Sequence, residues 1–572
     1  MYRENGTLVV SASDLVGFSA CSHLTWLNLQ VANGTLPHPR RKKKAEDSKE
    51  EVEEEEDIPD LMLQLLIERG LQHEREYRES LEQQGLNVIS LDDSEDSPRG
   101  RKQLADIRAK AAATTDALLE RAGVVFQGTF LDETESINWL GYADFIKPVN
   151  DESGENLEPE DTKLAGHVSV NAVIQLCNYV DHIERVTGKR PRKLRVVLGR
   201  GAPAEEFIVD QLLAYYEFLK QRFLAALESP VETYPLPVSH CGVCKWSQKC
   251  EKRWVDDDHL SLVAFMTTSQ VKRLEAAGIS DVATLAATDK TRRIPNVAPE
   301  VLTRLIEQAD LQKRSKGKPV PEWKLVLPAT TGLGLAPLPE KNDGDVFYDI
   351  EGHPYYGNNG LEYLHGIGTV ESGIFAFRPE WAHSPSEERR VFEELVDFLM
   401  ARWKQFPGMH VYHYAAYETT ALTRLMGQYG TREREIDAML RGNLFVDLYR
   451  VVRQGVRVGV RSYSIKRLEP LYMKPREGQI VMASSSVIEY ERWLQTRDPQ
   501  ILNDIETYNM EDVKSTWLLR GWLEERRAEV EKEQGPLPRT PPMTPDAAER
   551  DNPELRLLIS QLNADRPTMV SQ

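Results

Sequence analysis

The chain has 572 residues, of which 41% are hydrophobic and 28% are charged, a balance typical of globular proteins. Its length exceeds what a single core can organise and predicts roughly three to four domains. No run approaches the ~20 consecutive apolar residues of a membrane span, and the net charge of −19 excludes a uniformly basic surface.

The N-terminal residues show no basic flank followed by an apolar core, so we expect no secretory signal and a cytoplasmic location. Five cysteines in so long a chain fit a reducing compartment. Two local basic runs stand against the negative total, at residues 189–200 (KRPRKLRVVLGR) and at residues 450–467. Each is either a nucleic-acid contact or a solvated basic face.

The first 255 residues alternate helical and strand patterns. A basic block followed by an acidic block over residues 40–57 cannot bury apolar surface, so we expect a disordered insertion near 38–58. Helices are expected at 60–85, 101–122 and 164–186, and strands at 87–91, 124–132, 137–149 and 194–200. This mixture predicts an α/β domain over residues 1–255.

The rest of the chain predicts a helical module, a linker and a second α/β domain. Short helices are expected at 256–316, where LEAAGIS resembles a helix-hairpin-helix element that grips a phosphate backbone, although such turns also occur in proteins that bind nothing. A Pro- and Gly-rich linker is expected at 317–343, with a strand at 323–328. The second domain (344–534) is expected to contain a hairpin over 345–370, a strand at 409–414 and helices at 387–405, from 417 and at 501–533, before a flexible tail at 535–572.

Four of the five cysteines bracket the first domain. Cys21 precedes it, and Cys241, Cys244 and Cys250 close it with C-x2-C-x5-C spacing. Thiolates in such spacing hold a soft metal or an iron-sulfur cluster, and the long interval predicts a clasp between the two ends of one domain. The spacing alone does not choose between zinc and a cluster. Cys177 lies far from this pattern and is expected to be buried.

A first group of acids lies inside the clasp. Asp144 is in a predicted strand, and Asp161 and Lys163 follow two apart, so that strand alternation places their side chains on one face. Two carboxylates on adjacent strands predict a Mg²⁺ or Mn²⁺ site, and the ammonium predicts a group that orients water and stabilises the transition state.

Three more residues are candidates for the same site. His73, on the preceding helix, is a candidate metal ligand. Gln175 and Tyr179 lie four apart and so on one face of the following helix, where both side chains can approach the metal or the scissile phosphate.

This ordered set resembles the RecB family of PD-(D/E)xK nucleases, whose iron-sulfur members share a four-cysteine clasp. The resemblance covers roughly residues 8 to 255. It implies a restriction-endonuclease-like core, a [4Fe-4S] cluster on the four cysteines and a divalent metal at the acids. Many relatives have Glu where this chain has Asp161, and the neighbouring Glu160 is expected to face the opposite side. A structural zinc site is the alternative for the thiols.

A second group of acids lies in the C-terminal domain. Asp349 and Glu351 are two apart on a predicted strand, Glu418 opens a helix, and Tyr508 and Asp512 are four apart on the last helix. Four acids around one point repel unless cations bind them, which is the requirement of a two-metal phosphodiesterase site. Tyr508 is the candidate for orienting the attacking water.

The order D-x-E, carboxylate, Y-x3-D resembles the DEDDy 3′-5′ exonucleases of the ribonuclease H-like fold, over roughly residues 344 to 530. Glu418 stands where the family usually has Asp, and Asp447, near a predicted strand, is a reserve ligand.

Together the two resemblances imply a multidomain α/β DNA nuclease of repair, recombination or defence, with Mg²⁺ or Mn²⁺ at both sites. The sequence contains no G-x4-G-K-[ST] phosphate loop, so duplex unwinding would need a helicase partner. The alternatives are a 3′-5′ exoribonuclease and a non-catalytic scaffold that binds DNA for a helicase.

Overall fold

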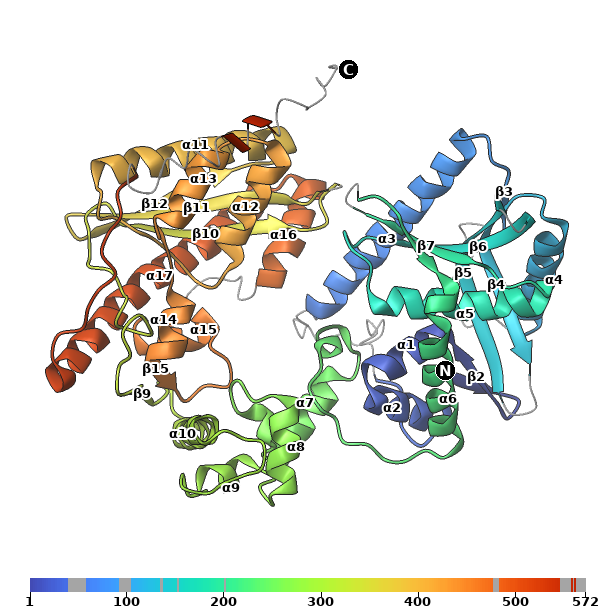
Figure 1. Cartoon of the computed structure of the whole chain (residues 1–572), viewed down its shortest axis with the longest axis horizontal. Helices are drawn as coiled ribbons and strands as arrows, with labels where there is room; N and C mark the ends of the chain where they lie inside the picture. The colour runs from blue at the N-terminus through green and yellow to red at the C-terminus, as the bar shows by residue number, and fades with distance from the viewer. Residues whose placement is uncertain are drawn as a thin grey trace, which may run out of the picture. The chain divides into compact units, whose positions relative to one another are not determined.

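The computed structural model divides the chain into two compact units. The first contains Met1–Ser261 together with Tyr355–Gly360, and the second contains the remainder (Figure 1). The structure describes residues 1–39, 58–91, 104–133, 137–151, 154–199, 202–357, 359–476, 483–545, 557–558 and 560–561. The insertion predicted near 38–58 falls almost wholly outside the described residues, as does much of the predicted tail. The finer division of the second unit into module, linker and α/β domain stays a prediction.

The first unit is built on one eight-stranded mixed sheet. Its strands are β1 (Tyr2–Glu4), β2 (Thr7–Ser11), β3 (Val88–Ser90), β4 (Val124–Glu133), β5 (Ile137–Asp151), β6 (Gly154–Lys163), β7 (Lys193–Leu198) and β8 (Glu205–Ile208). The main path runs β1-β2-β5-β6-β7-β8, and β4 pairs antiparallel with β5 and parallel with β3. The long strand β5 also pairs antiparallel with β6, which brings the two predicted acid-bearing strands together.

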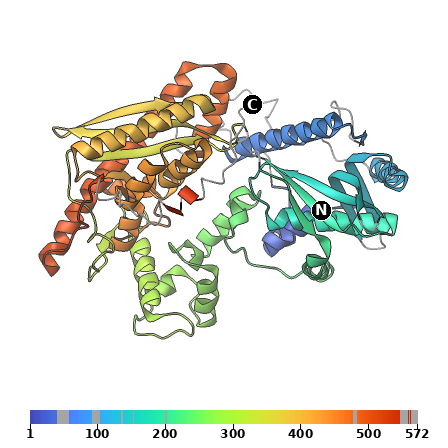
Figure 2. The same ribbon diagram turned by 45° about the horizontal axis from the view of Figure 1, so that its top comes forward.

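Helices pack on this sheet because their apolar faces complete its core. The helices of this unit are α1 (Ala12–Ala20), α2 (Ser22–Ala32), α3 (Ile58–Gln83), α4 (Leu104–Glu120), α5 (Val170–Thr187), α6 (Leu213–Glu228) and, with no buried side chain, α7 (Ser247–Asp256). The largest core cluster joins buried side chains of α1, α5 and α6 to those of the central strands. Figures 1 and 2 show the long helix α3, in blue, beside the sheet of its own unit. The helices predicted at 60–85 and 101–122 correspond to α3 and α4.

Helix α5 begins later than its apolar periodicity predicts. The predicted start was Leu164, whereas the helix begins at Val170 after the N-cap Ser169, whose Oγ accepts a hydrogen bond from the Ala172 amide at 3.3 Å. Capping, rather than periodicity, decides where the first turn forms, because an uncapped turn leaves its amides without acceptors.

The second unit begins with short helices and a two-stranded ribbon. Helices α8 (Thr268–Ala276), α9 (Val282–Ala286) and α10 (Pro299–Ser315) confirm the helices predicted after the last cysteine. The single strand predicted in the linker is β9 (Trp323–Leu325), and it pairs antiparallel with β15 (Val456–Val458). The linker is thereby attached to a segment more than a hundred residues later in the chain.

A five-stranded sheet organises the rest of the second unit, in the order β12-β11-β10-β13-β14. Its strands are β10 (Val346–His353), β11 (Leu361–Glu371), β12 (Ile374–Trp381), β13 (Val411–His413) and β14 (Phe445–Asp447). The first three pair antiparallel, which confirms the predicted hairpin, whereas β10, β13 and β14 run parallel. The strand β10 is therefore central, with a neighbour on each side.

The two faces of this sheet carry different helices. The further helices of the unit, after α8 to α10, are α11 (Pro385–Gln405), α12 (Tyr417–Tyr429), α13 (Glu433–Arg441), α14 (Leu448–Gly455), α15 (Ile465–Leu468), α16 (Ala483–Thr496) and α17 (Pro499–Gln534). Buried side chains of α11, α12 and α13 pack with Val346, Tyr348 and Ile350 of β10 (Figure 1). Those of α17 pack in a second cluster with Phe347, the alternate position on the strand.

The chain beyond α17 contacts this unit within the described residues. The indole of Trp403 donates a hydrogen bond to the carbonyl of Met543 at 3.1 Å. Among the described residues, no helix is both long and apolar enough to span a bilayer.

The close approach of α17 to β11 is testable. A Cβ added at Gly368 would lie 2.6 Å from Cγ1 of Val513 and 2.8 Å from the ring of Phe375. We expect Gly368→Ala to lower the free energy of unfolding by about 1–3 kcal/mol because the site is overpacked. The matched control is Gly427→Ala, at an exposed position of α12 with nothing within 4 Å of the added Cβ. Equal thermal melting of the two variants would contradict this packing.

Candidate metal-binding sites

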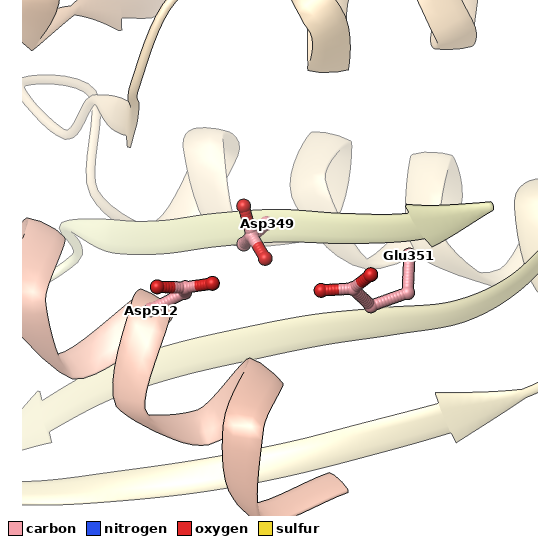
Figure 3. Close-up of side chains that lie close together, drawn as sticks. All are labelled: Asp349, Glu351 and Asp512. Atoms are coloured by element: carbon pink, nitrogen blue, oxygen red, sulfur yellow. The ribbon is translucent and has the colours of Figure 1, made fainter. Parts of the chain in front are cut away.

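Three carboxylates converge where β10 meets α17. Asp349 and Glu351 extend from the same face of the strand and Asp512 from the helix, with one oxygen of each within 4.8 Å of the others (Figure 3). Within the described part of the chain, this is the one group of three or more His, Cys, Asp or Glu side chains with that spacing. The structure therefore brings together three of the four acids that the sequence predicted for this site.

Neighbouring donors hold each carboxylate of this acidic triad in place. The amide of Asn509 donates to Oδ2 of Asp349 at 2.7 Å, and the hydroxyl of Ser486 donates to Oε2 of Glu351 at 2.6 Å. Arg476 donates to Oδ1 of Asp512 at 2.5 Å. Sequence reasoning missed these donors. Of these donors, only Asn509 could have been predicted from the sequence, because it lies about one helical turn before Asp512 and so near it on the helix surface.

The triad is electrostatically costly without a cation. Burial, and then repulsion by Asp512 and Glu351, raises the pKa of Asp349 well above its usual range. Burial also raises the pKa of Glu351 to about 8. The pKa of Asp512 is raised by burial even though Arg476 and Lys466 oppose the shift. Burial and mutual repulsion disfavour three ionised carboxylates, and a divalent cation between them reverses that preference.

Lys466 is a site residue that the sequence did not identify as one. It lies on α15, donates a hydrogen bond to the hydroxyl of Tyr508, and places its ammonium 4.1 Å from the centre of that ring. Burial lowers the pKa of Lys466, and the carboxylates of Asp512 and Glu351 oppose the shift. Burial and the nearby acids raise the pKa of Tyr508, so its hydroxyl stays protonated. The sequence showed Lys466 only as part of a basic run.

Glu418 and Asp447 have other partners. Glu418, in the first turn of α12, is buried, and its Oε2 lies 3.3 Å from Nδ1 of His413, outside the 4.8 Å group. Its charge nonetheless contributes to the raised pKa of Asp349, so it borders the triad. Asp447 caps α14, accepting hydrogen bonds from the amides of Tyr449 and Ala415 at 2.9 Å each.

The first unit brings Asp144, Asp161 and Lys163 to adjacent strands. Phe145 pairs with Glu160 in the β5–β6 ladder, one residue from each acid. The side chain of Asp161 is fully buried, and its Oδ2 lies 2.6 Å from Nζ of Lys163. Burial raises the pKa of both acids, and repulsion by Asp144 raises that of Asp161 further. Burial alone would lower the pKa of Lys163, but attraction to Asp161 and Asp144 raises it.

Glu160 faces away from this pair, as strand alternation predicts. It accepts a hydrogen bond from the hydroxyl of Tyr77 at 2.5 Å and lies 3.4 Å from Arg195. Its oxygens are therefore engaged on the other side of β6.

Of the predicted helical residues, Gln175 and Tyr179 lie near the pair. Gln175 donates to the hydroxyl of Tyr179 at 2.7 Å, and Tyr179 is buried, with its pKa raised by burial and then by the charges of Asp161 and Asp144. Nε2 of His73 is buried without a hydrogen-bond partner. Glu74, next to His73 on α3, is an acid of this site that no sequence pattern indicated, and its charge contributes to the raised pKa of Asp144.

The four bracketing cysteines line one small cavity with Leu24, Leu27 and Trp246. The pKa of Cys250 is raised to about 11 by burial and then by the other three thiols, and burial raises that of Cys244. Among the described residues, no three of these thiols lie within 4.8 Å of one another. The fifth, Cys177, is buried on α5, as predicted.

The C-terminal region resembles a known protein superfamily. Residues 346–524, from β10 into α17, match the RNase H superfamily model. The domain that carries the acidic triad is thus RNase H-like, which is consistent with a nuclease and with an acidic site for Mg²⁺ or Mn²⁺. No curated protein matches the chain.

The raised pKa of Glu351 predicts a pH dependence of stability. An acid with a pKa of about 8 in the folded protein and of about 4.3 when unfolded binds its proton more tightly in the folded state. Its contribution is therefore present at low pH and is lost as pH rises through about 8. We expect the melting temperature of chelator-treated protein to fall between about pH 5 and pH 8, and to fall less in Glu351→Gln. Identical profiles for both proteins would contradict the shift.

Proposed function

We propose that the protein is a metal-dependent nuclease and that the triad of Asp349, Glu351 and Asp512 is its principal hydrolytic site. The observation that carries the proposal is the convergence of three buried or half-buried carboxylates inside an RNase H-like domain. Oxygen ligands of this kind suit Mg²⁺ or Mn²⁺. Two such ions, when bound, would stabilise the attacking and leaving oxygens of a phosphodiester displacement.

The residues around the triad have separate roles in this proposal. Glu418 borders the triad and, if it leaves His413, supplies the fourth carboxylate. Tyr508 keeps its proton, so it acts as a hydrogen-bonding group that orients the attacking water rather than as a general base. Lys466 fixes the Tyr508 hydroxyl and adds a positive charge beside the site. An ammonium there favours the negative charge that develops on the phosphate.

We propose single-stranded or end-bearing DNA as the substrate, in repair, recombination or defence, with a helicase as a possible partner. The support is the resemblance of the N-terminal unit to RecB nucleases. RNA is the competing substrate because the same carboxylates and metal ions serve both polymers. Digestion of a mixture of matched DNA and RNA strands decides between them.

Asp144, Asp161 and Lys163 form a second nuclease site in this proposal. Their burial, the Lys163–Asp161 contact and the unpartnered Nε2 of His73 support it. His73 and Glu74 would complete the ligands from α3. Gln175 and Tyr179 would position the phosphate or a metal-bound water from α5.

We further propose that Cys21, Cys241, Cys244 and Cys250 hold a [4Fe-4S] cluster. Their common cavity supports a shared ligand. Tetrahedral zinc with Zn–S bonds of ~2.3 Å would draw all four sulfurs to within roughly 4 Å of one another. Four thiolates accept either zinc or a cluster, and the resemblance to the iron-sulfur nucleases is what favours the cluster in this proposal.

The nuclease proposal is tested with end-labelled single-stranded DNA and Mg²⁺ or Mn²⁺. We expect Asp349→Asn to lower the rate of nucleotide release by about 10²–10³-fold, because a lost carboxylate impairs metal and transition-state binding. The control is Asp504→Asn, at a half-buried position of the same helix as Asp512 and outside the triad. A separate Lys163→Ala variant measures how much of the nucleotide release depends on the first unit. Absence of cleavage by cluster-loaded protein would overturn the proposal.

The cluster proposal is tested on anaerobically purified protein. We expect iron and inorganic sulfide in similar amounts and a broad visible absorption, all lost in Cys241→Ser because one ligand is missing. Cys177→Ala, which removes the one cysteine outside the set, should retain them. Stoichiometric zinc with no iron would favour the zinc alternative. An unchanged melting profile in Cys241→Ser would contradict a clasp.

A further inference from the structure

A pocket lined by arginines lies within the second unit. Its volume is about 610 Å³, and its walls come from α10, from the chain after β9 and from α14 and β15. Four guanidinium side chains line it: Arg304, Arg450, Arg453 and Arg457. None of the three acids of the triad does so.

The pocket is assembled by close backbone packing. The amide of Gly334 donates to the side chain of Gln454 at 3.0 Å, and a Cβ at Gly334 would lie 2.9 Å from Cα of Gly455. The amide of Val326 donates to the carbonyl of Gly455 at 3.0 Å. The linker is thus held against the end of α14, and the arginines of α10, α14 and β15 line a common space with it.

The positive charge in this pocket exceeds the negative charge available to it. Arg457 lies 2.8 Å from Glu307, but Lys290 and Lys324 contact the same carboxylate at 2.9 and 2.6 Å. One carboxylate is therefore shared by three cations. The lining acid Asp447 is engaged in capping α14.

For the other arginines, the described residues include no carboxylate partner. Among the described residues, no Asp or Glu oxygen lies within 4 Å of the guanidinium of Arg304, Arg450 or Arg453. Arg453 instead lies over the ring of Phe265 at 4.7 Å. Burial and then the charges of Arg457 and Arg453 lower the pKa of Arg304, so these cations repel one another. The net charge of the chain is −19, so this local concentration of positive charge is unusual for it, and it is stabilised when an anion binds.

The volume of the pocket and its guanidinium hydrogen-bond donors indicate the class of ligand. Planar guanidinium groups donate paired hydrogen bonds that match phosphate oxygens. The volume falls in the ~300–1,000 Å³ range of small-ligand sites and would admit one nucleotide. Tyr449 adds an aromatic ring to the lining, on which a base can stack.

The pocket is connected in sequence to the acidic triad. The basic run that supplies Arg450, Arg453 and Arg457 ends near Lys466, which contacts Tyr508 beside the triad. Arg304 and the linker wall precede residue 346, so part of the pocket lies outside the region that matches the RNase H superfamily. We propose that this pocket holds a phosphodiester of the substrate strand, away from the bond that is cut. The proposal rests on the proposed function.

The test measures binding without cleavage, so that its outcome is separate from that of the nuclease assay. The full chain is titrated with fluorescein-labelled oligothymidylate in a chelator, at several salt concentrations. We expect Arg304→Gln and Arg453→Gln each to weaken binding by about 3–10-fold. Each should also reduce the slope of log affinity against log salt by roughly 0.7, as expected for one lost phosphate contact on a single strand.

The control is Arg461→Gln, which removes an exposed arginine of the same basic run that does not line the pocket. Equal affinities and salt slopes in all four proteins would overturn the proposal even if the enzyme cleaves DNA. Thymidine 5′-monophosphate is the second probe. If it binds as tightly as the oligonucleotide and depends on the same arginines, the pocket is a mononucleotide site and the strand assignment is wrong.

Discussion

The close packing of α17 against the sheet controls the C-terminal site. Asp349 and Glu351 belong to a central strand, whereas Asp512 belongs to a helix far along the chain, so their distance depends on how near the helix lies. Glycines on β11 permit this approach, since a Cβ at Gly366 would lie 1.8 Å from Oδ1 of Asn509. The same contact lets Asn509 donate to Asp349. Packing therefore brings like charges together, and the apolar contacts of α17 offset their repulsion.

The two groups of acids are neutralised differently. In the first unit, Lys163 provides an internal cation 2.6 Å from the buried carboxylate of Asp161. In the second, Arg476 contacts Asp512 and Lys466 lies beside Tyr508, whereas the hydrogen bonds described for Asp349 and Glu351 come from the neutral side chains of Asn509 and Ser486. More of the negative charge in the triad is thus left for a metal to compensate.

A negative net charge is compatible with a nucleic-acid substrate in this arrangement. The arginines of the pocket are concentrated on α10, α14 and β15, and the basic run continues to Lys466. Local positive potential, rather than total charge, directs an anionic strand toward an acidic site. A strand held at its backbone could then present its end to the carboxylates without contact between phosphate and unscreened acids.

Local periodicity determined much of the site in advance. Alternation along β10 put Asp349 and Glu351 on one face, and a spacing of four put Tyr508 and Asp512 on one side of α17, because both patterns depend only on neighbouring residues. Tertiary structure alone placed Ser486, Lys466 and Arg476 at the triad and joined the linker to β15. Those contacts join segments far apart in sequence, and their distances depend on the packing of whole elements, which no local spacing encodes.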